Sequence, residues 1–184
     1  MKKTLLLSLS LILSLGLTFG QNIYKATSGE ISFFSEAPME NIEAHNTQVK
    51  ALINTDKKEI AFIVPVIGFK FKKALMEEHF NENYMESDKY KTAQFTGVID
   101  GDVNFKKDGT YPATGKGKLN IHGVEQEREF TGELKVDGDK VMLSCDFKVK
   151  LEDHKIEIPK MVIKNIAEEV DVKVMATFEP KSAK

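Results

Sequence analysis

The chain has 184 residues, 41% of them hydrophobic and 29% charged, which is typical of a soluble folded domain and excludes a disordered or polytopic membrane protein. Its 26 basic and 28 acidic side chains give a net charge of -2, and Arg128 is the only arginine, so we predict no nucleic-acid partner. The single cysteine, Cys145, excludes an intrachain disulfide framework.

The first residues have the pattern of a signal peptide. Lys2 and Lys3 precede an apolar run over residues 5–17, and the small residues Thr18 and Gly20 follow it. We predict a signal peptide over residues 1–20 and one domain over residues 21–184. The alternative is a membrane anchor, but the run is shorter than the ~20 residues that a bilayer span needs. The mature protein is therefore expected in the periplasm or outside the cell, without a membrane span.

Apolar and polar residues alternate with a period of two in the mature chain, which is typical of antiparallel strands with one wet face. The pattern is clearest over residues 124–136 and 141–151, and Asp137-Gly138 between them predicts a hairpin. Another clear strand covers residues 170–178. Further strands are predicted, in chain order, around residues 31–33, 49–53, 60–66, 93–99 and 119–121.

Residues 59–71 are almost continuously apolar, so we expect this segment to be buried on both faces. A helix that would cover it follows directly, because Leu75, Met76, Phe80 and Tyr84 recur at helical spacing within residues 73–84. About eight strands and one helix, without a linker or repeat, predict one all-β domain, either a sandwich or a barrel.

Motifs of catalysis are not found in the sequence, which has no common nucleophile, nucleotide-binding or zinc-protease pattern. His79 and Glu82 have a helical spacing that suits a metal, but no further ligand lies near them in sequence, so we predict no metal and no cofactor. Most carboxylates occupy wet strand faces, which disfavours acid catalysis. An enzyme that uses His122 or His154 is the alternative from another class.

The inward faces of the strands mix phenylalanines with alanines and glycines. Such residues either interdigitate into a solid core or leave a hollow for an apolar ligand, and parity alone does not decide between the two. Gln126 and Arg128 also occupy positions that the alternation assigns to the inward face of their strand. A buried guanidinium needs an anionic partner, which is either the head group of a ligand or a carboxylate at the barrel rim.

Two motifs carry a family resemblance. Residues 79–95 read HFNENYMESDKYKTAQF and residues 115–124 read GKGKLNIHGV. In this order they resemble stretches of the YceI-like lipid/polyisoprenoid-binding family, and the likeness extends over roughly residues 23–178. The resemblance implies a lipocalin-like eight-stranded antiparallel β-barrel with one short helix. It also implies a lumen that holds an isoprenoid or a similar amphiphile, and no catalytic residues.

We therefore predict a protein that binds or carries an amphiphilic lipid such as a polyisoprenoid, and that is not an enzyme. The alternative is a secreted interaction or structural module with a filled barrel. Exposed edge strands would permit a homodimer. The head-group candidates are Gln126 and Arg128. The residues predicted to line or bound the lumen are Phe62, Phe69, Phe95, Leu119, Ile121, Phe130, Leu143, Phe147, Val174 and Phe178.

Overall fold

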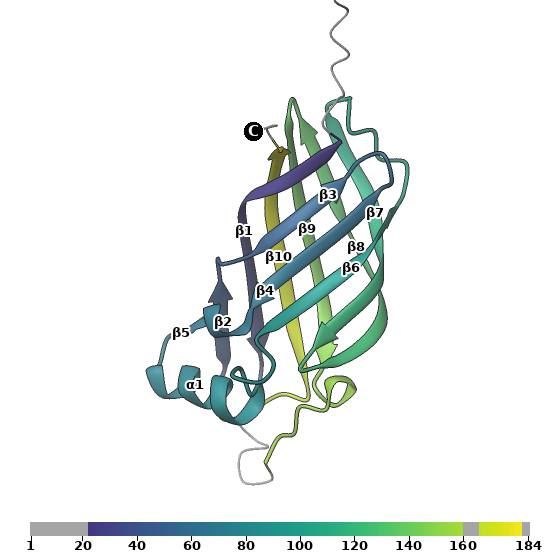
Figure 1. Cartoon of the computed structure of the whole chain (residues 1–184). Helices are drawn as coiled ribbons and strands as arrows, with labels where there is room; N and C mark the ends of the chain where they lie inside the picture. The colour runs from purple at the N-terminus through teal and green to yellow at the C-terminus, as the bar shows by residue number, and fades with distance from the viewer. Residues whose placement is uncertain (1–21, 160–165, 182–184) are drawn as a thin grey trace, which may run out of the picture.

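The computed structural model describes residues 22–159 and 166–181, so the predicted signal peptide lies outside the described part. Within this part, ten strands form one sheet that closes into a barrel, with a helix across one end (Figure 1). The helix α1 (Ala74–His79) continues into a π-helical turn, Phe80–Tyr84. The strands are β1 (Ile23–Ser35), β2 (Ile42–Asn46), β3 (Lys50–Asn54), β4 (Glu59–Pro65), β5 (Lys70–Phe71), β6 (Thr92–Asp100), β7 (Gly109–Ile121), β8 (Val124–Asp137), β9 (Lys140–Lys150) and β10 (Glu169–Pro180).

Eight strands close the barrel. Antiparallel neighbours follow the order β10-β9-β8-β7-β6-β4-β3-β1, and β1 pairs again with β10. The register of β1 on β10 shifts between Ala26 and Ser28, and a shift of this kind bends a strand. The start of β1 therefore pairs with β3 and its end pairs with β2, which in turn carries β5. The predicted eight-stranded antiparallel barrel with one short helix is confirmed.

Alternation and turn residues explain the regular part of this barrel. In β8 and β9 the buried residues lie on one face of each strand, two or four positions apart, and the predicted hairpin between the strands is closed by Gly138, whose φ is positive at 56°. His122 and Gly123 also have positive φ and form the tight turn between β7 and β8. β7 starts at Gly109, ten residues before its predicted strand, because its glycine-rich first half shows no clear alternation.

The expectation that residues 59–71 are buried on both faces is wrong. β4 alternates between buried and exposed positions, and Ile63 is 44% exposed on its outer face. The apolar run is also interrupted after Pro65 by a 3₁₀ turn, Val66–Gly68. The helix predicted over residues 73–84 is present, but it covers one end of the barrel and not the outer face of β4 (Figure 1).

The interior differs between the two ends of the barrel. At the end that carries the β3–β4 and β8–β9 turns, Ile53, Val136, Val141 and Phe178 are at most 1% exposed and belong to one packed cluster. The ring of Phe178 meets that of Phe62 edge-on at 6.2 Å between centroids. Toward the end where α1 lies, the lumen is hollow.

Candidate ligand-binding cavity

A cavity of about 380 Å³ occupies the hollow half of the lumen. This volume lies within the range of roughly 300–1,000 Å³ that is usual for small-molecule sites. Inward-facing residues of β1, β4 and of β6 to β10 form its wall, and almost all are apolar. Of the residues predicted for the lumen, those that line it are Phe62, Phe69, Phe95, Leu119, Ile121, Phe130, Leu143, Phe147 and Val174.

Phe178 is the predicted residue that bounds the lumen without lining the cavity. It has inward parity, but it lies in the packed end of the barrel and has no exposed surface. Its edge-on contact with Phe62 forms part of the floor beneath the cavity. Parity correctly identified the face of the strand on which Phe178 lies, but not the height along the barrel at which the packing becomes solid.

Four aromatic rings gather where the cavity meets the helix. Phe33 of β1, Phe69, Phe71 of β5 and Phe80 of the π-helical turn lie 5.0 to 5.8 Å apart between ring centroids, and all four line the cavity. Only Phe69 was among the predicted lumen residues. Phe33 was recoverable from the alternation with Ile31, and Phe80 from the apolar face of the helix.

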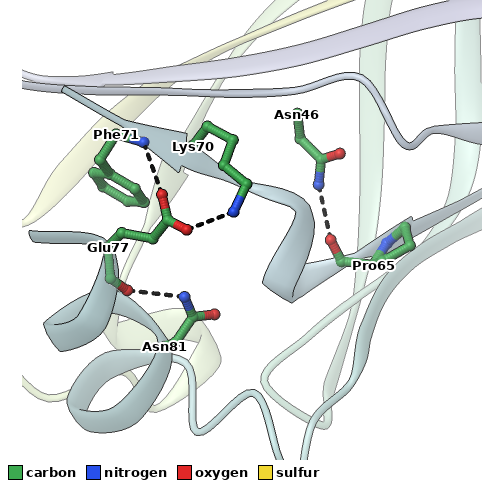
Figure 2. A network of polar contacts seen from close by, with 6 residues as sticks. All are labelled: Asn46, Pro65, Lys70, Phe71, Glu77 and Asn81. Carbon is green, nitrogen blue, oxygen red and sulfur yellow. Dashed lines mark hydrogen bonds and ion pairs between the residues drawn. The ribbon is translucent and has the colours of Figure 1, made fainter. Parts of the chain in front are cut away.

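Polar contacts hold the helix end against the barrel. Glu77 of α1 accepts from Lys70 at 2.5 Å and from the backbone N–H of Phe71 at 3.3 Å (Figure 2). The Lys70 ammonium lowers the pKa of Glu77, so this carboxylate stays charged. The side chain of Asn81 donates to the Glu77 carbonyl at 2.8 Å, and Lys73 pairs with Glu40 in the β1–β2 loop. These contacts on the surface hold α1 against the barrel, and with it the four phenylalanine rings, which we call the aromatic wall.

The structure does not bring the head-group candidates into the cavity wall. Gln126 donates to the Asp153 carbonyl at 2.9 Å, and Arg128 donates to the Lys148 carbonyl at 2.6 Å. Arg128 also lies 3.9 Å from the Asp153 carboxylate, which is the rim carboxylate of the alternative interpretation. Both side chains have the predicted inward parity, but the 3₁₀ turn Glu152–His154 packs beside the start of β8 and takes up their polar atoms.

The two histidines considered for catalysis hold this same turn in place. His154 is fully buried, and its Nδ1–H donates to the Val124 carbonyl at 3.2 Å. Burial lowers the pKa of His154, so its ring is neutral near neutral pH. His122 lies between the Glu86 carboxylate at 2.9 Å and the His154 carbonyl at 3.2 Å. Neither histidine is among the residues that line the cavity.

Cys145 contributes the one thiol of the cavity wall. It donates to the Thr131 carbonyl across a 3.5 Å contact, and burial raises its pKa to about 11. The thiol is therefore protonated and behaves as a small apolar group. Over residues 22–159 and 166–181 no three His, Cys, Asp or Glu side chains are arranged to hold a metal ion. The cavity can thus take up an apolar molecule by removing it from water.

A closed barrel whose lumen is solid at one end and hollow at the other is the architecture of a small-ligand-binding β-barrel. The family model of the YceI-like domain matches residues 23–178, so this chain belongs to the YceI-like family. The predicted family membership is confirmed. No significant match to a curated protein was found. No helix among the described residues has the length and apolarity that a membrane crossing requires.

Solved structures share the fold. A polyisoprenoid-binding domain from Saccharophagus degradans, implicated in plant cell wall breakdown, has a TM-score of 0.72 and 15% identity, over 88% of this chain and 100% of that one. BcnA of Burkholderia cenocepacia has a TM-score of 0.67 and 15% identity, over 81% of this chain and 95% of that one. The Campylobacter jejuni YceI protein has a TM-score of 0.56 and 14% identity, over 68% and 74%.

Proposed function

We propose that this protein binds an amphiphilic lipid, such as a polyisoprenoid, in the lumen of its barrel and does not catalyse a reaction on it. The observation that carries the proposal is the apolar cavity of about 380 Å³ behind the aromatic wall at the α1 end. Membership of the YceI-like family supports it, and so does the fold shared with a domain described as polyisoprenoid-binding.

Burial of hydrocarbon supplies the affinity. Each methylene that leaves water contributes about 0.8 kcal/mol. A handful of methylenes therefore reaches micromolar binding even after the cost of ordering the chain. Apolar walls distinguish poorly between tails of similar chemistry, so selectivity would come from the length that the solid end of the barrel admits. The packed cluster of Ile53, Val136, Val141 and Phe178 sets this limit.

The proposed place of action is the periplasm or the outside of the cell, and it rests on the signal-peptide pattern of residues 1–20. In that compartment a barrel would carry or store a lipid that water alone does not dissolve. The proposed roles need no nucleic acid, metal or cofactor. A homodimer stays a prediction, for which β5 offers one short unpaired edge at the end of the sheet order.

Native mass spectrometry tests the proposal directly. The mature chain is purified, extracted with organic solvent for lipid analysis, and then exposed in lipid-free form to farnesol and geranylgeraniol. We expect a co-purified lipid or a one-to-one complex with at least one of the two alcohols. A lipid-free protein that takes up neither would support the alternative, a filled interaction module, and would contradict the proposal.

A further inference from the structure

The barrel wall is not hydrogen-bonded over its full height between β8 and β9. The register between these strands ends at the pair Gly132–Cys145. In the described chain, residues 124–131 of β8 and 146–150 of β9 have no ladder partner on this side. The other edges of the two strands continue normally, since β8 stays paired with β7 and β9 with β10. We call this unpaired part of the wall the β8–β9 seam.

Ion pairs on the outer surface also do not cross the seam. If the register continued, Glu129 would lie opposite Lys148, which would be a favourable cross-strand pair. Instead the Lys148 ammonium binds Asp171 of β10 at 2.7 Å, and Lys118 of β7 binds Glu125 of β8 at 2.7 Å. These contacts join β9 to β10 and β7 to β8, and they leave the seam without a salt bridge between its two strands in the described residues.

Side chains close the seam where the backbone does not. Arg128 reaches across it and donates to the Lys148 carbonyl at 2.6 Å. Its guanidinium lies 5.6 Å from the ring centre of Phe130, and the rings of Phe130 and Phe147 lie 4.1 Å apart between centroids. Both phenylalanines line the cavity. The seam is therefore closed by side chains of the inward strand face, namely Arg128 and the Phe130–Phe147 ring pair. Beyond Arg128, the hydrogen bonds of Gln126 and His154 join the start of β8 to the turn that follows β9.

The cavity also extends to the part of the wall that lies beside the seam. Glu133 and Ser144 point outward from the barrel, yet both line the cavity, as Gln94 does on β6. Glu133 and Ser144 are opposite each other and form the ladder pair next to the last one, Gly132–Cys145. The cavity therefore extends along the wall at least as far as the last ladder pairs beside the seam.

We propose that the β8–β9 seam is a side portal through which the hydrocarbon ligand enters and leaves, with Phe130 and Phe147 as its gate and Arg128 as its latch. This inference rests on the proposed lipid-binding function. One end of the lumen is solid and the other is covered by α1 and its aromatic cluster. Opening the seam breaks side-chain contacts only, those of Arg128 with Lys148 and Asp153, of Cys145 with Thr131 and of Phe130 with Phe147, whereas parting fully paired strands breaks several backbone hydrogen bonds.

A reversible cross-link across the seam tests the portal. The native Cys145 is buried and unreactive and stays in place, while the exposed positions Glu129→Cys and Lys148→Cys are joined by a short bis-methanethiosulfonate reagent. Uptake and release of the fluorescent prenyl alcohol anilinogeraniol are then followed by stopped flow. The cross-link is expected to slow both rates by about tenfold or more at unchanged equilibrium affinity, and reduction with dithiothreitol should restore them.

A matched control uses Lys135→Cys and Met142→Cys, which are opposite each other in the paired part of the same two strands. This cross-link should leave both rates unchanged. Rates that differ by less than about twofold between the cross-linked and reduced seam variant would overturn the portal but leave lipid binding intact. Equal slowing by both cross-links would also overturn it. Failure of the unsubstituted protein to bind the probe would overturn lipid binding and the portal together.

A separate experiment tests the role of Arg128 as the latch. Arg128→Ala should speed release of anilinogeraniol several-fold. Arg128→Lys keeps the charge but loses the planar guanidinium group, so its release rate should lie between those of Arg128→Ala and the parent. Urea unfolding of each variant separates a loosened gate from a loosened fold, because only the first changes release while the unfolding midpoint is kept. A release rate of a folded Arg128→Ala protein equal to that of the parent would overturn the latch.

Discussion

Two inward glycines of β7 have different structural roles, although they lie two positions apart. A Cβ atom at Gly117 would lie 2.2 Å from the Thr96 carbonyl oxygen, so this glycine permits the close approach of β6 and β7. A Cβ atom at Gly115 would make only ordinary contacts, with the ring of Phe95 at 3.7 Å and the Phe130 carbonyl oxygen at 3.9 Å. Gly115 lines the cavity, and its missing side chain is part of the hollow.

We therefore predict that Gly115→Leu fills the cavity and weakens binding of a prenyl alcohol by about tenfold or more while the protein stays folded. Gly117→Ala is the matched control and should cost about 2 kcal/mol of stability, because the backbone of β6 has to move. Fluorescence titration and urea unfolding measure the two effects. Undiminished binding by a folded Gly115→Leu protein would show that ligand does not occupy this part of the lumen.

Burial makes the Cys145 thiol a poor nucleophile. With its pKa raised to about 11, the native thiol is almost entirely protonated at pH 8. We predict that iodoacetamide labels the native protein roughly a hundredfold more slowly than the urea-unfolded chain at this pH. Mass spectrometry of timed samples measures both rates. Equal rates would mean that the wall around Cys145 opens freely to water.

His154 links folding to pH. Its burial holds the pKa of the folded state below the ordinary value of 6.5, so the unfolded chain binds a proton that the folded chain rejects. Stability should therefore fall as the pH drops from about 7.5 to 5.5. His45 acts in the opposite direction, since its hydrogen bond to Glu30 raises its pKa.

The comparison of the parent with His154→Gln separates the two histidines. The urea midpoint of the variant should fall less steeply with decreasing pH than that of the parent, whatever its absolute stability at neutral pH. Identical slopes would show that His154 is as easily protonated in the folded protein as in the unfolded one.

At the scale of elements, Asn46 joins β2 to the end of β4. This residue has no exposed surface and donates to the Pro65 carbonyl at 2.8 Å (Figure 2). Its side-chain oxygen accepts from the Gln48 backbone N–H at 2.8 Å. A Cβ atom at Gly68 would lie 2.8 Å from the same amide, so the 3₁₀ turn packs directly on it. Asn46 thus replaces the ladder bonds that β2 and β4 do not make.

Asn46→Asp keeps the shape of the side chain but removes its donor and introduces a buried acid. We predict a loss of about 2–4 kcal/mol in the free energy of unfolding, measured by urea denaturation. Gln48→Ala is the control, because its backbone N–H still reaches Asn46 and its stability should change little. A loss below about 0.5 kcal/mol for Asn46→Asp would show that β2 is held by other contacts.

The elements that the sequence predicted well are those with strict alternation and a defined turn, such as β8, β9 and the hairpin at Gly138. β5 was missed because two residues are too few to show a period, and β2 because one of its buried inward positions is the polar Asn46. The interpretation of residues 59–71 failed because a continuous apolar run hides the period of two that β4 follows. The turn that captures Arg128 comes from a distant part of the chain, so its contact with β8 was not readable from sequence.

At the scale of the whole molecule, the barrel combines a solid half with a hollow half. Parity identified the inward residues but not which of them pack together, because that depends on the height at which each strand meets its neighbours. Phe62 and Phe178 illustrate the point, since both face inward but only Phe62 lines the cavity. The solid end of the lumen therefore stabilises the fold, and the hollow end provides the space for a ligand.

Crystallography with a brominated prenyl alcohol tests most directly whether the hollow half accepts a hydrocarbon. Anomalous scattering locates the bromine without relying on the shape of the electron density. We predict a bromine peak inside the barrel, within contact distance of Phe95, Phe130 or Leu143, with Phe178 still packed on Phe62 beneath it. A lumen whose phenylalanine rings have closed on one another, with bromine only outside the wall, would contradict the account.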